Sequence, residues 1–251
     1  MPVSKFNVHL ANLFYAQRAR WLVVAWSWVS LVAIAAPPAD MAERVKPCEA
    51  CHGQQGRAGP DGYYPRLAGK PAGYLYNQMQ NFAQGKRHYE LMRRMVTPLS
   101  PEYQQEMAQY FASLTVPYLP PAKNAALLSE PQRQRGRQLA QEGDSDLKLP
   151  ACSTCHGEQL MGNNAHVPSL LGLPAAYLGA QLSAWQLGQR STAAPDCMAH
   201  LAKQLSTDDI AAVSAWLASQ PVPTQTLSPT PTPRAQIPRC ASAPELHKAA
   251  P

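Results

Sequence analysis

Two short stretches of the sequence combine cysteine and histidine at a spacing that can bind a prosthetic group covalently. They are Cys48-x-x-Cys51-His52 and Cys152-x-x-Cys155-His156. In this C-x-x-C-H arrangement both thiols can form thioether bonds with the vinyl groups of a haem, and the histidine that follows can be the proximal ligand of its iron. The sequence therefore predicts two covalently bound haem c groups, with His52 and His156 as iron ligands.

A C-x-x-C pair also occurs in zinc sites and in redox-active dithiols. A zinc site would need two further Cys or His ligands at suitable spacing beside each motif, and a thioredoxin-like dithiol would need a βαβ pattern. The sequence has neither feature near the two motifs. Two complete copies, each with the histidine in place, favour haem attachment.

The two motifs belong to an internal repeat. At an offset of 103 residues, a P-x-L-x-G segment, a proline, a Tyr-Leu pair, a glutamine and a G-x-R segment recur in the same order. The first copy has Pro65, Leu67, Gly69, Pro71, Tyr74, Leu75, Gln78, Gly85 and Arg87, and the second has Pro168, Leu170, Gly172, Pro174, Tyr177, Leu178, Gln181, Gly188 and Arg190. The chain is therefore a duplicated domain with small length changes in its loops.

Each copy has the same expected order of elements. A short amphipathic helix leads into C-x-x-C-H, a Gly/Pro loop follows, a second helix begins near Tyr74 or Tyr177, and a polar loop and a final helix end the copy. Ser100 and Ser206 precede acidic residues, as helix N-caps do. The 25 prolines and 14 glycines fit many loops, and no period-two pattern indicates a sheet. An all-α fold is expected.

Composition divides the chain into five parts. Residues 1–36 form a signal peptide or membrane anchor, 37–118 the first haem domain, 119–131 a linker, 132–220 the second haem domain, and 221–251 an extended tail with eight prolines. Each domain is small, so its core alone is only marginally stable, and a covalent cofactor adds stability.

The N-terminal segment has the features of an export signal. It carries positive but no acidic side chains, and the run from Trp21 to Ala36 is 16 residues long and interrupted only by Ser27 and Ser30. Cleavage would give a soluble periplasmic protein, whereas retention would attach the protein to the inner membrane through residues 21–36. In both cases the rest of the chain lies outside the cytoplasm.

A methionine in each copy is a candidate for the second axial iron ligand. Met198 stands seven residues before Leu205, and Met92 stands seven residues before Leu99. A thioether ligand would favour ferrous iron and close it to substrates. Met95 competes with Met92, because the alignment depends on where a gap is placed.

These residues together resemble the cytochrome c4 family. Over roughly residues 41–220, both copies show C-x-x-C-H-G, P-x-L-x-G, a Tyr-Leu helix that ends in G-x-R, and a methionine before Leu-Ser. The resemblance implies two tandem class I cytochrome c domains related by pseudo-twofold symmetry, each with one His/Met haem. It also implies electron transport in a periplasmic respiratory chain rather than catalysis.

The resemblance leaves the redox partners open. A terminal oxidase such as the cbb3 type is the expected acceptor, and a quinol-cytochrome c reductase or a periplasmic dehydrogenase is an expected partner. The same architecture occurs in cytochrome subunits of dehydrogenase complexes and, as a further alternative, in dihaem enzymes such as thiosulfate dehydrogenase.

Two cysteines remain after haem attachment, Cys197 and Cys240. In an oxidising compartment, a disulfide between them is expected, which would hold the tail beside Met198. The alternative is that Cys197 itself binds iron, as in thiosulfate dehydrogenases with a cysteine-ligated haem.

The charge of the chain is less informative than its motifs. Nucleic-acid binding needs a concentrated basic face, which a formal net charge of +6 does not establish, so no nucleic-acid partner is expected. Arg87, Arg93 and Arg94 lie close together in sequence near Met92, where they could pair with haem propionates, steer an acidic partner or simply be solvated. Three loop histidines, at positions 88, 166 and 200, are expected at the surface without a ligand role.

Overall fold

The computed structural model describes residues 40–247 except 60–62, 119–127, 164 and 224–238. Within these ranges the regular elements are helices, with two isolated β-bridges and no strand. The expected all-α class is confirmed. No helix in the described ranges is long and apolar enough to cross a membrane, and the expected signal or anchor segment lies outside them.

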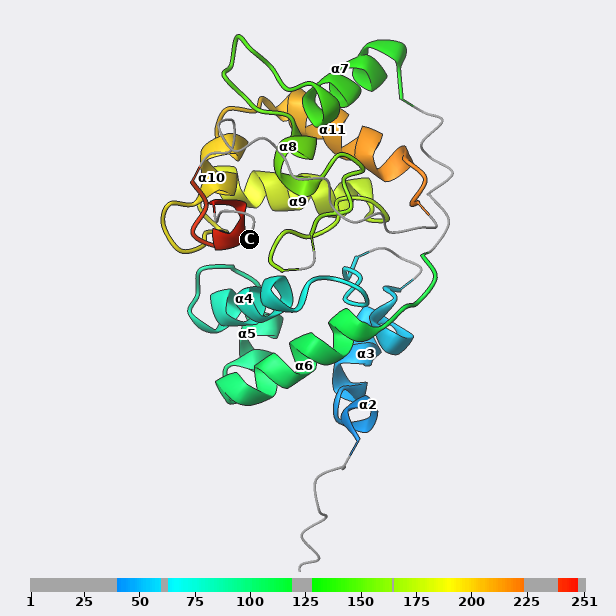
Figure 1. Ribbon diagram of the computed structural model, residues 1–251, viewed down its shortest axis with the longest axis vertical. Coiled ribbons are helices and arrows are strands. Elements are labelled where there is room, and N and C mark those ends of the chain that lie inside the picture. The colour runs from blue at the N-terminus through cyan, green and yellow to red at the C-terminus, as the bar shows by residue number, and fades with distance from the viewer. Residues whose placement is uncertain (1–39, 60–62, 119–127, 164, 224–238, 248–251) are drawn as a thin grey trace, which may run out of the picture. The chain divides into compact units, whose positions relative to one another are not determined.

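The helices form two sets, which we call the first lobe (residues 40–118) and the second lobe (residues 128–223). The first lobe contains α2 (Met41–Arg44), α3 (Lys46–His52), η2 (Gln54–Gly56), α4 (Ala72–Ala83), α5 (Glu90–Val96) and α6 (Pro101–Ser113). The second contains α7 (Glu130–Gln141), α8 (Cys152–His156), α9 (Ala175–Gln186), α10 (Cys197–Ala202) and α11 (Thr207–Ser219) (Figure 1). A C-terminal segment, residues 239–247, contains the 3₁₀ turn η5 (Pro244–His247).

The expected N-caps of the two final helices are confirmed. The Ser100 hydroxyl accepts a hydrogen bond from the backbone N–H of Tyr103 at the start of α6. Ser206 forms a full capping box with Asp209 at the start of α11. Each cap satisfies an N–H group that the helix itself leaves without a partner.

Two short helices replace the expected polar loops. In α5, Glu90 pairs with arginines three and four residues further on, which is the spacing at which helical side chains meet. In α10, the Asp196 carboxylate caps the helix by accepting from the N–H of Ala199 at 3.0 Å. Ion pairs between side chains in α5 and a side-chain cap in α10 therefore stabilise the two short helices.

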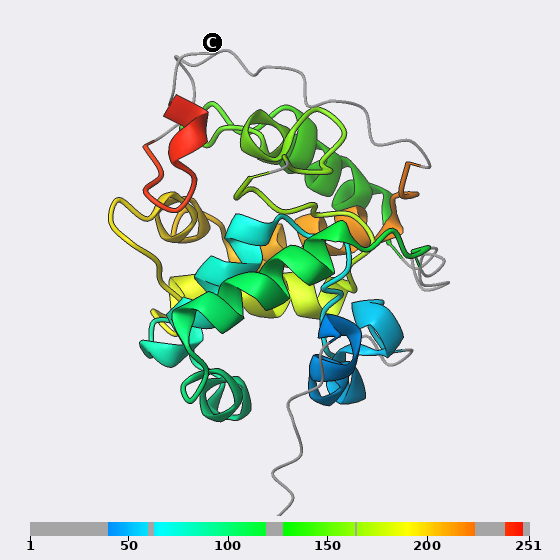
Figure 2. The same cartoon turned by 60° about the horizontal axis from the view of Figure 1, so that its bottom comes forward.

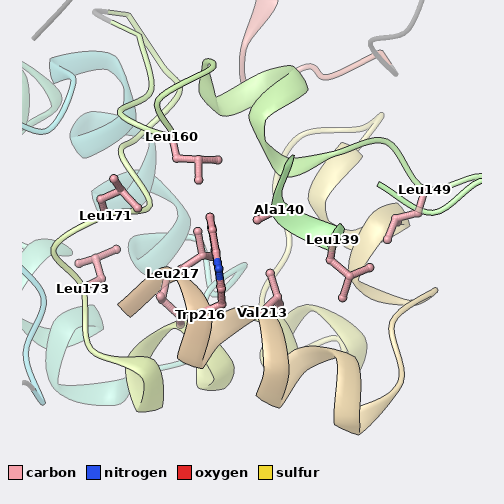
Figure 3. Packing of buried hydrophobic residues seen from close by; sticks show 10 residues of the cluster. Leu139, Ala140, Leu149, Leu160, Leu171, Leu173, Val213, Trp216 and Leu217 are labelled. Carbon is pink, nitrogen blue, oxygen red and sulfur yellow. The ribbon is translucent and has the colours of Figure 1, made fainter. Parts of the chain in front are cut away.

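Each lobe has its own apolar core. The second-lobe core is formed by Leu139, Ala140, Leu149, Leu160, Leu171, Leu173, Leu178, Val213, Trp216 and Leu217, most of which Figure 3 labels. The first-lobe core is formed by Val45, Leu75, Met107, Ala108 and Phe111. Met107 is thus a core residue.

Helix α11 packs against α7 on one side and α9 on the other, as Figures 1 and 2 also show. At the contact with α7, a Cβ on Gly136 would lie 2.4 Å from the Ala212 carbonyl oxygen and 2.6 Å from the Cβ of Trp216. At the contact with α9, a Cβ on Gly179 would meet nothing nearer than the Ser214 hydroxyl, at 3.6 Å. The approach of α7 to α11 therefore requires a glycine, and that of α9 does not.

An ion-pair network links the middle of α7 to the start of α11 and to the turn that follows α7 in the second lobe. The Arg135 guanidinium lies 2.7 Å from an Asp144 carboxylate oxygen and 2.6 Å from one of Asp209. The hydrogen bond from Arg135 lowers the pKa of Asp144. Burial alone would raise the pKa of Asp209, but Arg135 and the cap at Ser206 lower it.

Candidate functional site

The cysteine and histidine residues of each C-x-x-C-H motif lie in one short helix. In α3 and α8, the two cysteines are one turn apart, and the histidine is the last helical residue before a glycine. All four motif cysteines are free and half-buried. One helical turn thus places two thiols and one imidazole together in each lobe.

Both motif histidines are buried and held in the same way. His52 is 6% exposed and its Nδ1 lies 2.8 Å from the Pro65 carbonyl oxygen. His156 is 8% exposed and its Nδ1 lies 2.8 Å from the Pro168 carbonyl oxygen. Since a carbonyl can only accept, each Nδ1 carries the proton, and Nε2 is left with a lone pair for a metal.

Burial also keeps both imidazoles neutral. Loss of hydration lowers the pKa of His52, and the positive charge of Arg87 adds to this effect. Burial lowers the pKa of His156 to about 4, with a further contribution from Lys70. Neutral imidazole is the form that binds iron, so both residues are in the correct protonation state at neutral pH.

The role of Pro65 and Pro168 in this arrangement is not evident from the sequence. Both prolines stand out in the repeat, but the group that acts is the backbone carbonyl, which every residue type has. The signal that could have found it is the similar spacing from histidine to proline in the two copies, 13 residues in the first and 12 in the second.

The candidate axial methionines differ in exposure. Met92 and Met198 are half-buried, on α5 and α10 respectively, whereas the side chain of Met95 is 42% exposed. Met198 packs against an apolar cluster that includes Val167, Cys197 and Cys240. Burial therefore favours Met92 over Met95 as the residue that faces the interior of the first lobe.

The two lobes meet through matched residues of the repeat. Arg87 donates to Gln78 of its own lobe at 2.9 Å and to Gln181 of the other lobe at 2.7 Å. Arg190 donates to Gln181 at 2.8 Å and to Gln78 at 2.8 Å. The two arginines also form an antiparallel backbone bridge with each other. The contact is reciprocal, as expected for pseudo-twofold symmetry.

Both interface arginines are buried without a carboxylate. Arg87 is 9% exposed and Arg190 4%, and neither pairs with an acidic side chain among the described residues. In the same part of the chain, Arg190 Nε and Trp185 Nε1 are buried and have no hydrogen-bond partner. Two buried cations beside free donors need an anionic group nearby.

A haem in each lobe fits these observations. Its propionates would supply the missing negative charge at the interface, its vinyl groups would react with the thiols, and its iron would bind the free Nε2 of each histidine. Arg93 and Arg94, grouped with Arg87 by sequence, instead lie exposed on α5 and pair with Glu90. Of the three arginines, only Arg87 is placed for an interior role.

The C-terminal segment packs on the second lobe beside α10 (Figures 1 and 2). Cys197 and Cys240 form a disulfide in the structure. Glu245 accepts from His166, with 2.9 Å between Oε2 and Nδ1. His166 is therefore half-buried and paired, not a solvated surface residue as the sequence suggested, while His88 and His200 are exposed.

Comparison with known proteins gives consistent matches. The Cytochrome c family model matches residues 134–221. The thiosulfate dehydrogenase electron acceptor of Thiomonas intermedia (strain K12) is 36% identical over 221 residues, which cover 88% of this chain and 90% of that protein. Cytochrome c4 of Stutzerimonas stutzeri is 33% identical over 187 residues, which cover 69% of this chain and 84% of that protein.

A solved structure supports the same assignment. Reduced recombinant cytochrome c4 from Pseudomonas stutzeri matches with a TM-score of 0.59 and 32% identity, over 71% of this chain and 95% of that one. The resemblance predicted from the motifs is confirmed, as is the expectation of covalent haem c. The chain belongs to the cytochrome c4 family, and its cofactors are two covalently bound haem c groups.

Proposed function

We propose that this protein is a periplasmic electron carrier that accepts electrons from a dehydrogenase of thiosulfate and passes them to a terminal oxidase, such as one of the cbb3 type. The observation that carries the proposal is the pair of buried, neutral histidines, each held by a proline carbonyl, together with a half-buried methionine at a sequence-matched position in each lobe. The name of the Thiomonas relative supports thiosulfate dehydrogenase as the donor.

We assign the iron ligands as His52 with Met92 and His156 with Met198. Bound haem c supplies the Fe(III)/Fe(II) couple. The chain's own contribution is to hold an imidazole and a thioether for each iron and to exclude water with the buried residues around them. An iron with six ligands offers no open position, so a carrier role is favoured over an enzymatic one.

The structure offers no support for a cysteine-ligated iron. Cys197 would need a free thiolate to bind iron, and it forms a disulfide with Cys240. A dihaem enzyme of the thiosulfate dehydrogenase type is therefore the weaker alternative. A cytochrome subunit fixed to a dehydrogenase complex differs from a free carrier only in attachment, which residues 1–36 would decide.

An absorption spectrum of the purified protein tests the ligand assignment. We expect two haems per chain, the methionine-to-iron charge-transfer band in the oxidised form, and no binding of carbon monoxide in the reduced form. Met92→Leu should remove about half of the charge-transfer band, while the matched control Met95→Leu should leave it unchanged. The reverse result for these two variants would assign Met95 instead.

Reduction kinetics test the proposed donor. Mixing the oxidised protein with thiosulfate and a catalytic amount of thiosulfate dehydrogenase should reduce both haems, and omission of either the enzyme or the thiosulfate should prevent this. The reduced protein should then be oxidised by membranes that contain a cbb3-type oxidase. If a quinol-cytochrome c reductase reduced the protein and the dehydrogenase did not, the proposed donor would be wrong and the reductase would take its place.

A further inference from the structure

Lys70 of the first lobe reaches into the second lobe. Its side chain is buried, with 3% of the residue exposed, and its Nζ donates to the Ser169 carbonyl oxygen at 2.7 Å. Burial lowers the pKa of Lys70 to about 7, because loss of hydration disfavours the ammonium form, and the nearby Arg66 acts in the same direction. A fully buried lysine without a carboxylate partner among the described residues is uncommon.

The lysine contact lies next to the hydrogen bond that holds His156. Ser169 directly follows Pro168, whose carbonyl oxygen accepts from His156 Nδ1. The carbonyl bound by the ammonium and the carbonyl bound by the imidazole therefore belong to consecutive residues. The positive charge of Lys70 also contributes to the lowered pKa of His156, after the larger effect of burial.

The symmetry-equivalent contact, from the second lobe to the first, cannot form because the aligned residues differ. In the repeat, Lys70 aligns with Leu173, and Ser169 aligns with Arg66. The Arg66 guanidinium donates to three backbone carbonyls within its own lobe. Among the described residues, Lys70 thus adds to the reciprocal interface a positive charge that has no counterpart at Leu173, and this charge lies on the side of His156.

We propose that the positive charge of the Lys70 ammonium raises the reduction potential of the second-lobe haem from across the lobe interface. Ferric haem carries one more positive charge than ferrous haem, so a nearby ammonium favours the ferrous form, and low-polarity surroundings strengthen this effect. The lysine thereby makes the two otherwise similar sites unequal. This inference rests on the proposed assignment of His156 and Met198 to one iron.

A redox titration of the full holoprotein, followed by haem absorbance at pH 6, measures the effect on each haem. Lys70→Met removes the charge and the hydrogen bond, whereas Lys70→Gln removes the charge but keeps a donor. Both variants should lower the potential of the same single step by a similar amount. We expect a three- to tenfold shift of the Fe(II)/Fe(III) ratio, with tenfold corresponding to about 59 mV for one electron.

Two further variants make the outcome specific. Lys203→Met removes an exposed lysine that follows α10 in the second lobe, where solvent screens the charge, and it should leave both potentials unchanged. Met198→His should lower one step strongly and thereby identify the second-lobe haem, since methionine ligation raises the potential.

The results separate failure of this inference from failure of the ligand assignment. A shift in Lys70→Met but not in Lys70→Gln would show that the lysine acts through its hydrogen bond and would overturn the inference. Unchanged potentials in both variants, or a shift confined to the first-lobe step, would also overturn it. If Met198→His left both reduction potentials unchanged, the assignment of Met198 as an iron ligand would be wrong.

Discussion

The close contact between α7 and α11 gives a quantitative prediction for Gly136→Ala. The new Cβ would lie 2.4 Å from the Ala212 carbonyl oxygen, far inside the ~3.5–4.0 Å of a normal contact. Overpacking of this kind typically destabilises by about 1–3 kcal/mol. The opposing atom is a helix backbone carbonyl, which cannot rotate away, so we expect the upper end of that range.

One smaller term, helix propensity, sets the net value. Alanine is a better helix former than glycine by about 1 kcal/mol, which leaves a net destabilisation of about 2 kcal/mol for Gly136→Ala. Gly179→Ala, on the other helix that packs against α11, gains the same helix propensity without a close contact. It should be as stable as the parent protein or more stable by about 0.5–1 kcal/mol.

Thermal unfolding of the holoproteins, followed by far-ultraviolet circular dichroism and haem absorbance, measures both effects. For a unit of about 200 residues, 2 kcal/mol corresponds to a decrease in Tm of roughly 4–8 °C. Haem content must first be shown to be equal in all three proteins. If Gly136→Ala were as stable as Gly179→Ala, α7 and α11 could move apart without a loss of stability, and the packing argument would be refuted.

Two further substitutions test the lobe interface and the ion-pair network. In Gly73→Ala, the added Cβ would lie 2.5 Å from the His166 ring of the other lobe, so the lobes should move apart. The backbone N–H of Ser191, which donates to the first lobe, should then exchange its hydrogen faster. An unchanged exchange rate would contradict the contact. In Arg135→Gln, the two aspartates lose the partner that lowers their pKa values. Stability from a lowered carboxyl pKa is present above the unfolded value of about 4 and is lost as pH falls through the folded value. The variant should therefore be less stable than the parent at pH 7, and this difference should shrink towards pH 3 in denaturant titrations; an equal difference at both pH values would refute the network's role.

Local features of this protein could be read from the sequence. The haem motifs, the repeat and the caps at Ser100 and Ser206 each depend on a few neighbouring residues, so their chemistry is visible in a short window. The all-α class follows from the same helix periods and caps.

Features that depend on contacts between distant segments could not be read in this way. The sequence does not distinguish Arg87 from the nearby Arg93 and Arg94. Arg87 is buried because the second lobe packs against it. Likewise, His166 is paired because Glu245, 79 residues away, is brought beside it by a segment whose proline content suggested an extended tail. The buried position of Lys70 has the same origin.

The reciprocal contact between Arg87 and Arg190 also bears on how the chain arose. In a two-fold contact, the same surface serves as both partners, so one sequence can supply both sides. A single ancestral domain with arginine and glutamine at these positions would already have matched a second copy of itself. Gene duplication and fusion then required a linker but no new interface, and a later departure from symmetry, such as lysine at one position and leucine at its counterpart, could differentiate two sites that began as equals.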